Sequence, residues 1–174
     1  LIFLFMNLKL IIVIYFIFLL EASSQSKVEW VELKNNIEFN NNGKKIIIDL
    51  YTDWCGWCKV MDKNTFTDPS VITLINENFS PVKFDAEYKE SVFFNSSSYN
   101  YVPSGRRGVN ELAYYLTNGK LSYPMTIFLD ENYNLITLLP GYHKPKFYKS
   151  VLNYIAKDYW KEMSWDDYLK LNSN

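Results

Sequence analysis

The fold of this chain is decided by residues 46–59, which read IIIDLYTDWCGWCK. Ile46, Ile47 and Ile48 open a dense apolar run, a pattern typical of a strand buried on both faces of a sheet. A helix is expected to follow, from near Cys55 to about residue 64. Cys55 therefore lies where a buried strand turns into a helix, and Cys58 lies about one turn further along.

Two cysteines with this spacing at the start of a helix favour a reactive redox pair. Free backbone N–H groups and the helix dipole stabilise a thiolate at Cys55, whereas Cys58 is expected to be less exposed. Cys55 is thus the predicted nucleophile, and Cys58 the thiol that resolves a mixed disulfide. Gly56 would allow a partner chain to approach closely, and Trp54 and Trp57 would form an apolar rim around the sulfurs.

Two other interpretations of the cysteine pair remain open. A zinc site usually needs four ligands, and besides its two cysteines the chain offers a single histidine, His143. His143 is interpreted as a surface residue, and no metal is expected. A structural disulfide is the second alternative, but such bridges stabilise most when they close long loops, and a bridge across two residues constrains little.

Periodicity and capping signals predict the remaining elements. Asp68 is an N-cap followed by proline at the first helical position, and Ser164 opens a capping box. The order strand, helix, strand, helix, strand, helix, strand, strand, helix predicts one α/β domain with a mixed sheet. The expected ranges are a strand at 28–30, helices at 31–40 and from 69, a strand at 81–85, a helix at about 109–118, a hairpin at 125–139 and a helix from 145.

The segment from residue 86 to residue 107 shows no periodicity, and such long segments are usually functional or mobile. It contains Arg106 and Arg107, the only arginines in the chain. They are interpreted as solvated loop charges, with recognition of a carboxylate or a partner surface as the alternative. Tyrosines in and just after this segment are expected to pack it rather than to bind a cofactor; they are Tyr99, Tyr101, Tyr114 and Tyr115.

These residues resemble the thioredoxin-like superfamily, and especially its exported bacterial members with a WCGWC active site. The resemblance is carried by residues 46–59, by residues 82–85, and by residues 122–126 on to Gly141. It implies a thioredoxin-like fold, a central mixed sheet flanked by helices, with an insertion at about 86–122 before the strand that follows Pro124.

The resemblance also implies roles for residues away from the cysteines. Pro124 matches the family's cis-proline, which would turn the backbone of Tyr123 toward Cys55 to pair with an extended substrate. Asp49 matches a buried carboxylate that transfers protons to and from Cys58, and Lys83 matches the lysine beside it. On residue pattern alone, a trans proline and a solvated Asp49 are the alternatives.

The chain departs from the family between its cysteines and before its proline. Gly-Trp replaces the Gly-Pro of ordinary thioredoxins, which leaves the redox potential open. Tyr123 is bulkier than the family's common residues at that position, so a reshaped substrate groove is expected.

The N-terminal segment predicts export. Lys9 precedes an apolar run at 10–20, followed by small residues, which is the pattern of a secretory signal peptide at 1–24 cleaved after Ser24. Met6 is the expected true start, and an uncleaved membrane anchor is the alternative. Removal leaves residues 25–174 as one domain, 174 − 24 = 150 residues, in a periplasmic or secreted setting that permits disulfides.

Composition narrows the classes of function. The 18 Lys+Arg against 19 Asp+Glu give a net charge of −1, which supplies no general attraction to nucleic acid. No glycine-rich phosphate loop or organic cofactor is indicated. The predicted function is an exported, monomeric thiol:disulfide oxidoreductase that reduces exported proteins and is recycled by an unidentified reductant. A disulfide-inserting oxidase or isomerase, and a non-catalytic binding module, are the alternatives.

Overall fold

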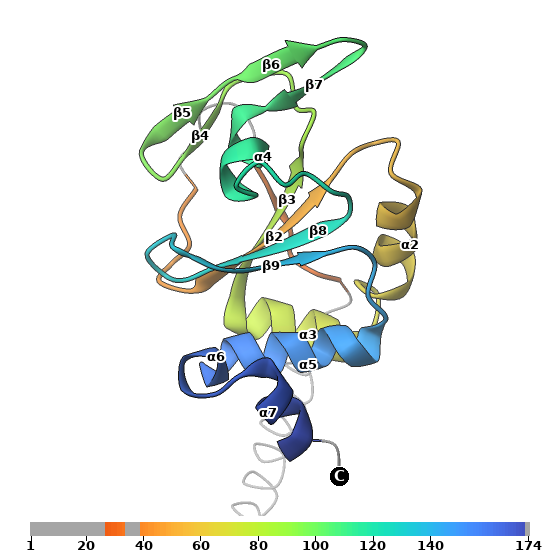
Figure 1. Ribbon diagram of the computed structural model, residues 1–174, viewed down its shortest axis with the longest axis vertical. Coiled ribbons are helices and arrows are strands. Elements are labelled where there is room, and N and C mark those ends of the chain that lie inside the picture. The colour runs from red at the N-terminus through yellow and green to blue at the C-terminus, as the bar shows by residue number, and fades with distance from the viewer. Residues whose placement is uncertain (1–26, 34–38, 173–174) are drawn as a thin grey trace, which may run out of the picture.

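The computed structural model describes residues 27–33 and 39–172 (Figure 1). The predicted signal peptide lies outside this range, as does the middle of the helix predicted at 31–40. In the part of the chain that is described, no helix is long and apolar enough to cross a membrane.

A five-stranded mixed sheet forms the centre of the molecule, in the order β1-β3-β2-β8-β9. Three strands are parallel: β1 (Val31–Glu32), β2 (Lys45–Tyr51) and β3 (Phe79–Asp85). The other two, β8 (Met125–Leu129) and β9 (Leu135–Pro140), are antiparallel to their neighbours. The predicted strands at 46–51 and 81–85 and the hairpin at 125–139 are confirmed, and so is the mixed sheet.

Strand β2 has no free edge, since β3 and β8 pair with it on its two sides. Its alternating side chains enter two separate cores. Ile46, Ile48 and Leu50 belong to the core beneath α4 (Glu111–Leu116). Ile47 belongs to the opposite core.

That opposite core is covered by three helices, of which α3 and α5 run side by side along the sheet (Figure 1). They are α2 (Gly56–Asn64), α3 (Pro69–Asn78) and α5 (Pro145–Ala156). The predicted cap of α3 is confirmed, because the Asp68 side chain accepts hydrogen bonds from the backbone N–H groups of Ser70 and Val71. Helix α2 leaves β2 at the end where Tyr51 lies, which fixes the place of the cysteines.

The N-terminal strand lies three residues later than predicted. Residues 28–30 form no strand, whereas Val31 and Glu32 pair with Val82 and Lys83 of β3. The backbone N–H of Glu29 instead donates to the side chain of Asn76. The helix predicted at 31–40 is therefore wrong at its start.

The segment that lacked periodicity contains two β-hairpins, which lie together above the sheet beside α4 (Figure 1). The first pairs β4 (Val92–Phe94) with β5 (Ser97–Tyr99), and the second pairs β6 (Tyr101–Ser104) with β7 (Arg107–Asn110). Strands of three or four residues are too short for an alternating pattern to stand out. The helix predicted from 109 begins at Glu111, because Asn110 ends β7 and caps α4.

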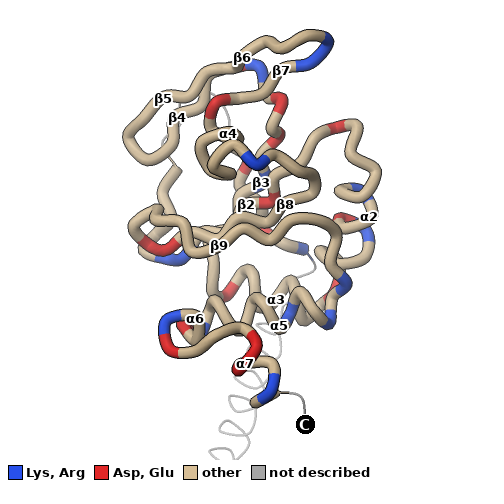
Figure 2. Tube along the Cα trace, in the orientation of Figure 1, with Lys and Arg blue, Asp and Glu red and all other residues tan. Residues whose placement is uncertain are grey.

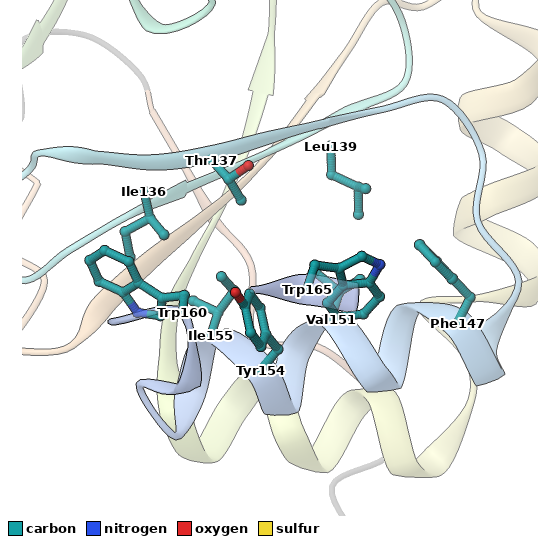
Figure 3. Close-up of a pocket in the computed structure, with 9 residues that line it drawn as sticks. All are labelled: Ile136, Thr137, Leu139, Phe147, Val151, Tyr154, Ile155, Trp160 and Trp165. Carbon is teal, nitrogen blue, oxygen red and sulfur yellow. The ribbon is translucent and has the colours of Figure 1, made fainter. Parts of the chain in front are cut away.

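The C-terminal region closes the face formed by α5. Helices α6 (Tyr159–Glu162) and α7 (Trp165–Leu171) follow it, and the predicted cap of α7 at Ser164 is confirmed. An apolar groove of about 400 Å³ lies between β9 and these helices (Figure 3). Its lining includes neither cysteine; it comprises Ile136, Thr137, Leu139, Phe147, Val151, Tyr154, Ile155, Trp160 and Trp165.

Candidate active site

The two cysteines form a disulfide at the first turn of α2. Cys55 is the N-cap of the helix, and its Sγ accepts a hydrogen bond from the backbone N–H of Cys58 at 3.0 Å. The backbone N–H of Cys55 donates to the carbonyl of Thr52 at 3.0 Å, which holds the turn between strand and helix. The sulfur of Cys55 thus lies at the N-terminus of the helix and accepts one of its first N–H groups, as predicted from the strand-to-helix junction.

The expected difference in exposure between the cysteines is absent. Cys55 and Cys58 are each 4% exposed. Trp54 and Trp57, which precede them, are 51% and 62% exposed. The aromatic side chains, not the nucleophile, form the accessible surface, because in the bonded pair both sulfurs turn to one another. No neighbouring atom lies within 4 Å of the position that a Cβ of Gly56 would occupy, so a partner can approach there.

Asp49 lies in β2, the strand that leads into this turn, and is 2% exposed. The alternative interpretation of Asp49 as a solvated residue at the end of the strand is therefore wrong. Register places it directly opposite Lys83 of β3, and its Oδ2 lies 3.1 Å from the Lys83 Nζ. Burial raises the pKa of Asp49 to about 6, although the charge of Lys83 opposes that rise. Asp49 is therefore a carboxyl group that exchanges its proton near neutral pH.

Asp62 completes this charged cluster, and it was not among the residues predicted for the site. It lies one turn after Cys58 on α2, and its carboxylate forms an ion pair and a short hydrogen bond with Lys83. Burial opposes the charge on Lys83, but Asp49 and Asp62 outweigh that effect and raise the pKa of Lys83. The i, i+4 spacing from Cys58 was the available signal, since such residues share one helix face.

A shallow groove of about 330 Å³ adjoins the start of α2 at Trp57, and it is lined by Trp57, Tyr123, Pro124, Gly141 and Tyr142. The Tyr123–Pro124 peptide bond is cis. The carbonyl of Pro124 accepts a hydrogen bond from the backbone N–H of Gly141, and Trp57 stacks on Tyr142 with ring centroids 5.6 Å apart. Both walls of the groove are therefore braced by contacts within the chain.

Arg107 reaches this site from hairpin β6–β7, whose tip carries the positive charge seen in Figure 2. Its guanidinium carbon lies 4.4 Å from the centre of a Trp54 ring, and its Nη1 lies 3.8 Å from Glu87 Oε1. Glu87 also accepts a hydrogen bond from the Trp54 indole N–H at 2.8 Å. Arg107 is thus exposed, as expected of a solvated charge, and in addition it contacts Trp54 and Glu87.

His143 takes part in other contacts. Its Nε2 lies 3.0 Å from the carbonyl oxygen of Pro140, and its ring stacks on Phe147 at 4.8 Å. Within residues 27–33 and 39–172, no cluster of three or more histidine, cysteine or acidic residues could hold a metal ion.

Comparisons with known proteins agree with this geometry. The sequence pattern of the thioredoxin-like domain matches residues 34–156. Over 55 residues, or 29% of its length, the chain is 38% identical to the thiol:disulfide interchange protein DsbD of Shigella boydii serotype 4 (strain Sb227) and of Escherichia coli (strain K12). The chain spans about 10% of the length of these relatives.

Two solved structures share the fold. A thioredoxin-fold protein from Helicobacter pylori superposes with a TM-score of 0.61 at 19% identity, covering 87% of this chain and 89% of that chain. The DsbH oxidoreductase superposes with a TM-score of 0.50 at 12% identity, covering 78% and 89%. At such low identities the likeness extends to the fold alone.

The raised pKa of Asp49 predicts how stability depends on pH. Because the folded protein holds this proton more tightly than the unfolded chain does, the free energy of unfolding falls as pH rises from about 4 to about 6. Asp49→Asn is expected to remove this loss, which makes the oxidised variant more stable than wild type at pH 8 by up to about 3 kcal/mol. Denaturant unfolding at pH 4 and pH 8 measures the difference.

The matched control is Asp53→Asn, since Asp53 is an exposed carboxylate on the same turn. Its unfolding free energy should follow that of wild type at both pH values. An Asp49→Asn protein that loses as much stability as wild type between pH 4 and pH 8 would contradict the prediction.

Proposed function

The chain belongs to the thioredoxin-like domain family, and from that premise we propose that it is a thiol:disulfide oxidoreductase that reduces disulfides of exported proteins. The observation that carries the proposal is the disulfide-bonded pair Cys55–Cys58 at the start of α2, beside the groove that contains the cis Tyr123–Pro124 bond. A purely structural disulfide would need neither the helix N-terminus nor the adjoining groove.

The reduced pair would transfer two electrons in two steps. The Cys55 thiolate attacks one sulfur of the partner's disulfide, which forms a mixed disulfide and releases the partner's other sulfur as a thiolate that takes up a proton. Cys58 then loses its proton and attacks Cys55, which forms the Cys55–Cys58 disulfide and releases the second partner thiol. An external dithiol must reduce the pair again before the next turnover.

The buried carboxylate suits the second step. Asp49 has a pKa of about 6, so at neutral pH it is mostly ionised and can accept the proton that Cys58 must lose. Lys83 lies 3.1 Å away and stabilises the ionised form, and Asp62 holds the lysine from the other side. We assign the proton transfer to Asp49. Lys83 and Asp62 are assigned the adjustment of the Asp49 pKa.

The groove supplies a place for the partner chain. An extended partner segment would pair with the backbone at Tyr123–Pro124, in the manner of a strand added to a sheet. The side chains of Trp54 and Trp57, together with the open space above Gly56, would contact the residues on either side of the partner's cysteine. The protein acts as a monomer in this scheme, without a metal, an organic cofactor or nucleic acid.

Cysteine variants test the proposed chemistry by reduction of insulin disulfides with dithiothreitol as the electron source. Cys55→Ser is expected to fall to the background rate, since it removes the nucleophile. Cys58→Ser, reduced and then freed of dithiothreitol before insulin is added, is expected to accumulate a mixed disulfide because the resolving thiol is missing, and mass spectrometry would detect the added partner mass. His143→Ala is the control and should keep the wild-type rate. Equal, background rates for the wild type and for Cys55→Ser would indicate the non-catalytic binding module.

The direction of electron flow depends on the redox potential. We expect a value nearer the thioredoxin end than the DsbA end of the range from about −270 to about −120 mV. This expectation rests on the Trp-Cys-Gly sequence around Cys55, which is like that of thioredoxins. Equilibration with glutathione buffers, followed by counting of free thiols, measures the potential. A value near −120 mV would favour the disulfide-inserting oxidase or isomerase instead.

Export is proposed from the signal-like pattern at residues 1–24. Two of the similar proteins are named as DsbD, a thiol:disulfide interchange protein. Expression with the full leader in a bacterial host should give a periplasmic protein whose mature chain begins at Gln25, as measured by intact mass. A protein that keeps its leader and stays with the membrane fraction would support the uncleaved anchor.

A further inference from the structure

Hairpin β6–β7 is held firmly enough to position a side chain at the active site. Asn110 at its base is fully buried, caps α4, and donates side-chain hydrogen bonds to the carbonyls of Tyr88 and Glu90. A Cβ on Gly108 would lie 2.4 to 2.5 Å from Val102 and Tyr101 across the hairpin, so only glycine fits there. Arg107, one residue before Gly108, therefore starts from a fixed backbone.

Three contacts fix the Trp54 side chain although half of it is exposed. The Arg107 guanidinium lies over one of its rings at 4.4 Å, and Glu87 accepts its indole N–H at 2.8 Å. The Tyr123 ring meets it edge to face, with centroids 5.9 Å apart. Trp54 thus joins the insertion to the residue before the cis proline, and it directly precedes Cys55 in the sequence.

An exposed tryptophan on a turn would otherwise lose rotational freedom when a partner binds against it. Ordering such a side chain opposes association, and fixing it beforehand removes that cost. A cation over an indole ring at a partly exposed site favours that orientation by about two- to fivefold. The benefit reaches only partners large enough to touch Trp54 as well as the sulfur of Cys55.

We propose that Arg107 is a positioning residue that fixes Trp54 against Tyr123 at the rim of the partner groove, and that it thereby strengthens the binding of disulfides in polypeptide chains and leaves small disulfides unaffected. This inference rests on the proposed function and adds to it a positioning residue outside the cysteine motif. The polar cleft that Arg107 shares with Glu87, about 500 Å³ in volume, extends the same surface along the insertion. A partner chain that leaves the groove past Trp54 would meet this cleft.

Arg107→Ala tests the inference with two probes, insulin and 2-hydroxyethyl disulfide. For insulin, KM is expected to rise about fivefold while kcat changes less than twofold, because the lost contact acts on binding rather than on the reacting sulfurs. For 2-hydroxyethyl disulfide, kcat/KM should stay within twofold of wild type, since that molecule has little surface to bury against Trp54. Arg107→Lys keeps the charge but not the planar group, and should restore part of the loss.

Two variants guard against a general defect. Lys120→Ala removes an exposed positive charge that lies outside this cleft and takes part in neither contact of Arg107, and it should match wild type with both probes. Glu87→Gln keeps an acceptor for the Trp54 indole N–H but removes the ion pair with Arg107. It should also raise the KM for insulin. This variant therefore tests the positioning of Trp54 even if Arg107→Ala folds poorly.

Each remaining outcome counts against the inference. Equal losses of kcat/KM with both probes would indicate a general effect on the cysteines. An unchanged KM for insulin would show that Arg107 is not needed to position Trp54. A faster reaction of Arg107→Ala with insulin would make the hairpin an obstructing lid. A wild-type protein that reduces neither probe would contradict the proposed function itself.

Discussion

The pairing of β2 between β3 and β8 is the constraint on which the site depends. Because this strand is hydrogen-bonded on both sides, the end of β2 has a fixed position, and the turn that leads to Cys55 begins from there. Pro124 lies at the same end of the sheet, because the next residue, Met125, is opposite Leu50 of β2. The pairing thereby brings three features to one end of the sheet: the start of α2, the disulfide and the Tyr123–Pro124 peptide bond.

The register of the sheet also places the charged groups. Asp49 is opposite Lys83 on one side and Thr126 on the other. Thr126 is in hydrogen-bond contact with the buried hydroxyl of Tyr148, 3.1 Å away, so the row of polar groups continues beneath the sheet. A carboxyl group in such surroundings is costly to ionise, and Lys83 limits that cost without abolishing it. The balance gives Asp49 a pKa suited to proton exchange near neutrality.

In the insertion, sequence patterns do not predict the secondary structure. Its two hairpins consist of strands of three and four residues, in which alternation cannot be distinguished from chance. The contact of Arg107 with Trp54 could not be predicted, because nothing in a one-dimensional pattern relates two residues that are 53 positions apart. The role of Asp62 could not be predicted for the same reason, since it depends on a lysine of another element.

The sequence by itself determined the class of fold, the main strands and helices, and the cysteine pair at a helix start, because these depend on local periodicity, capping and spacing. It also indicated Asp49, Lys83 and Pro124 through resemblance to a family. Only the tertiary structure decided that both sulfurs are equally buried, that Lys83 is shared by two carboxylates, and that an inserted hairpin reaches the tryptophan beside the nucleophile. Those features arise from contacts between distant segments, whose geometry exists only once the sheet has fixed where each segment lies.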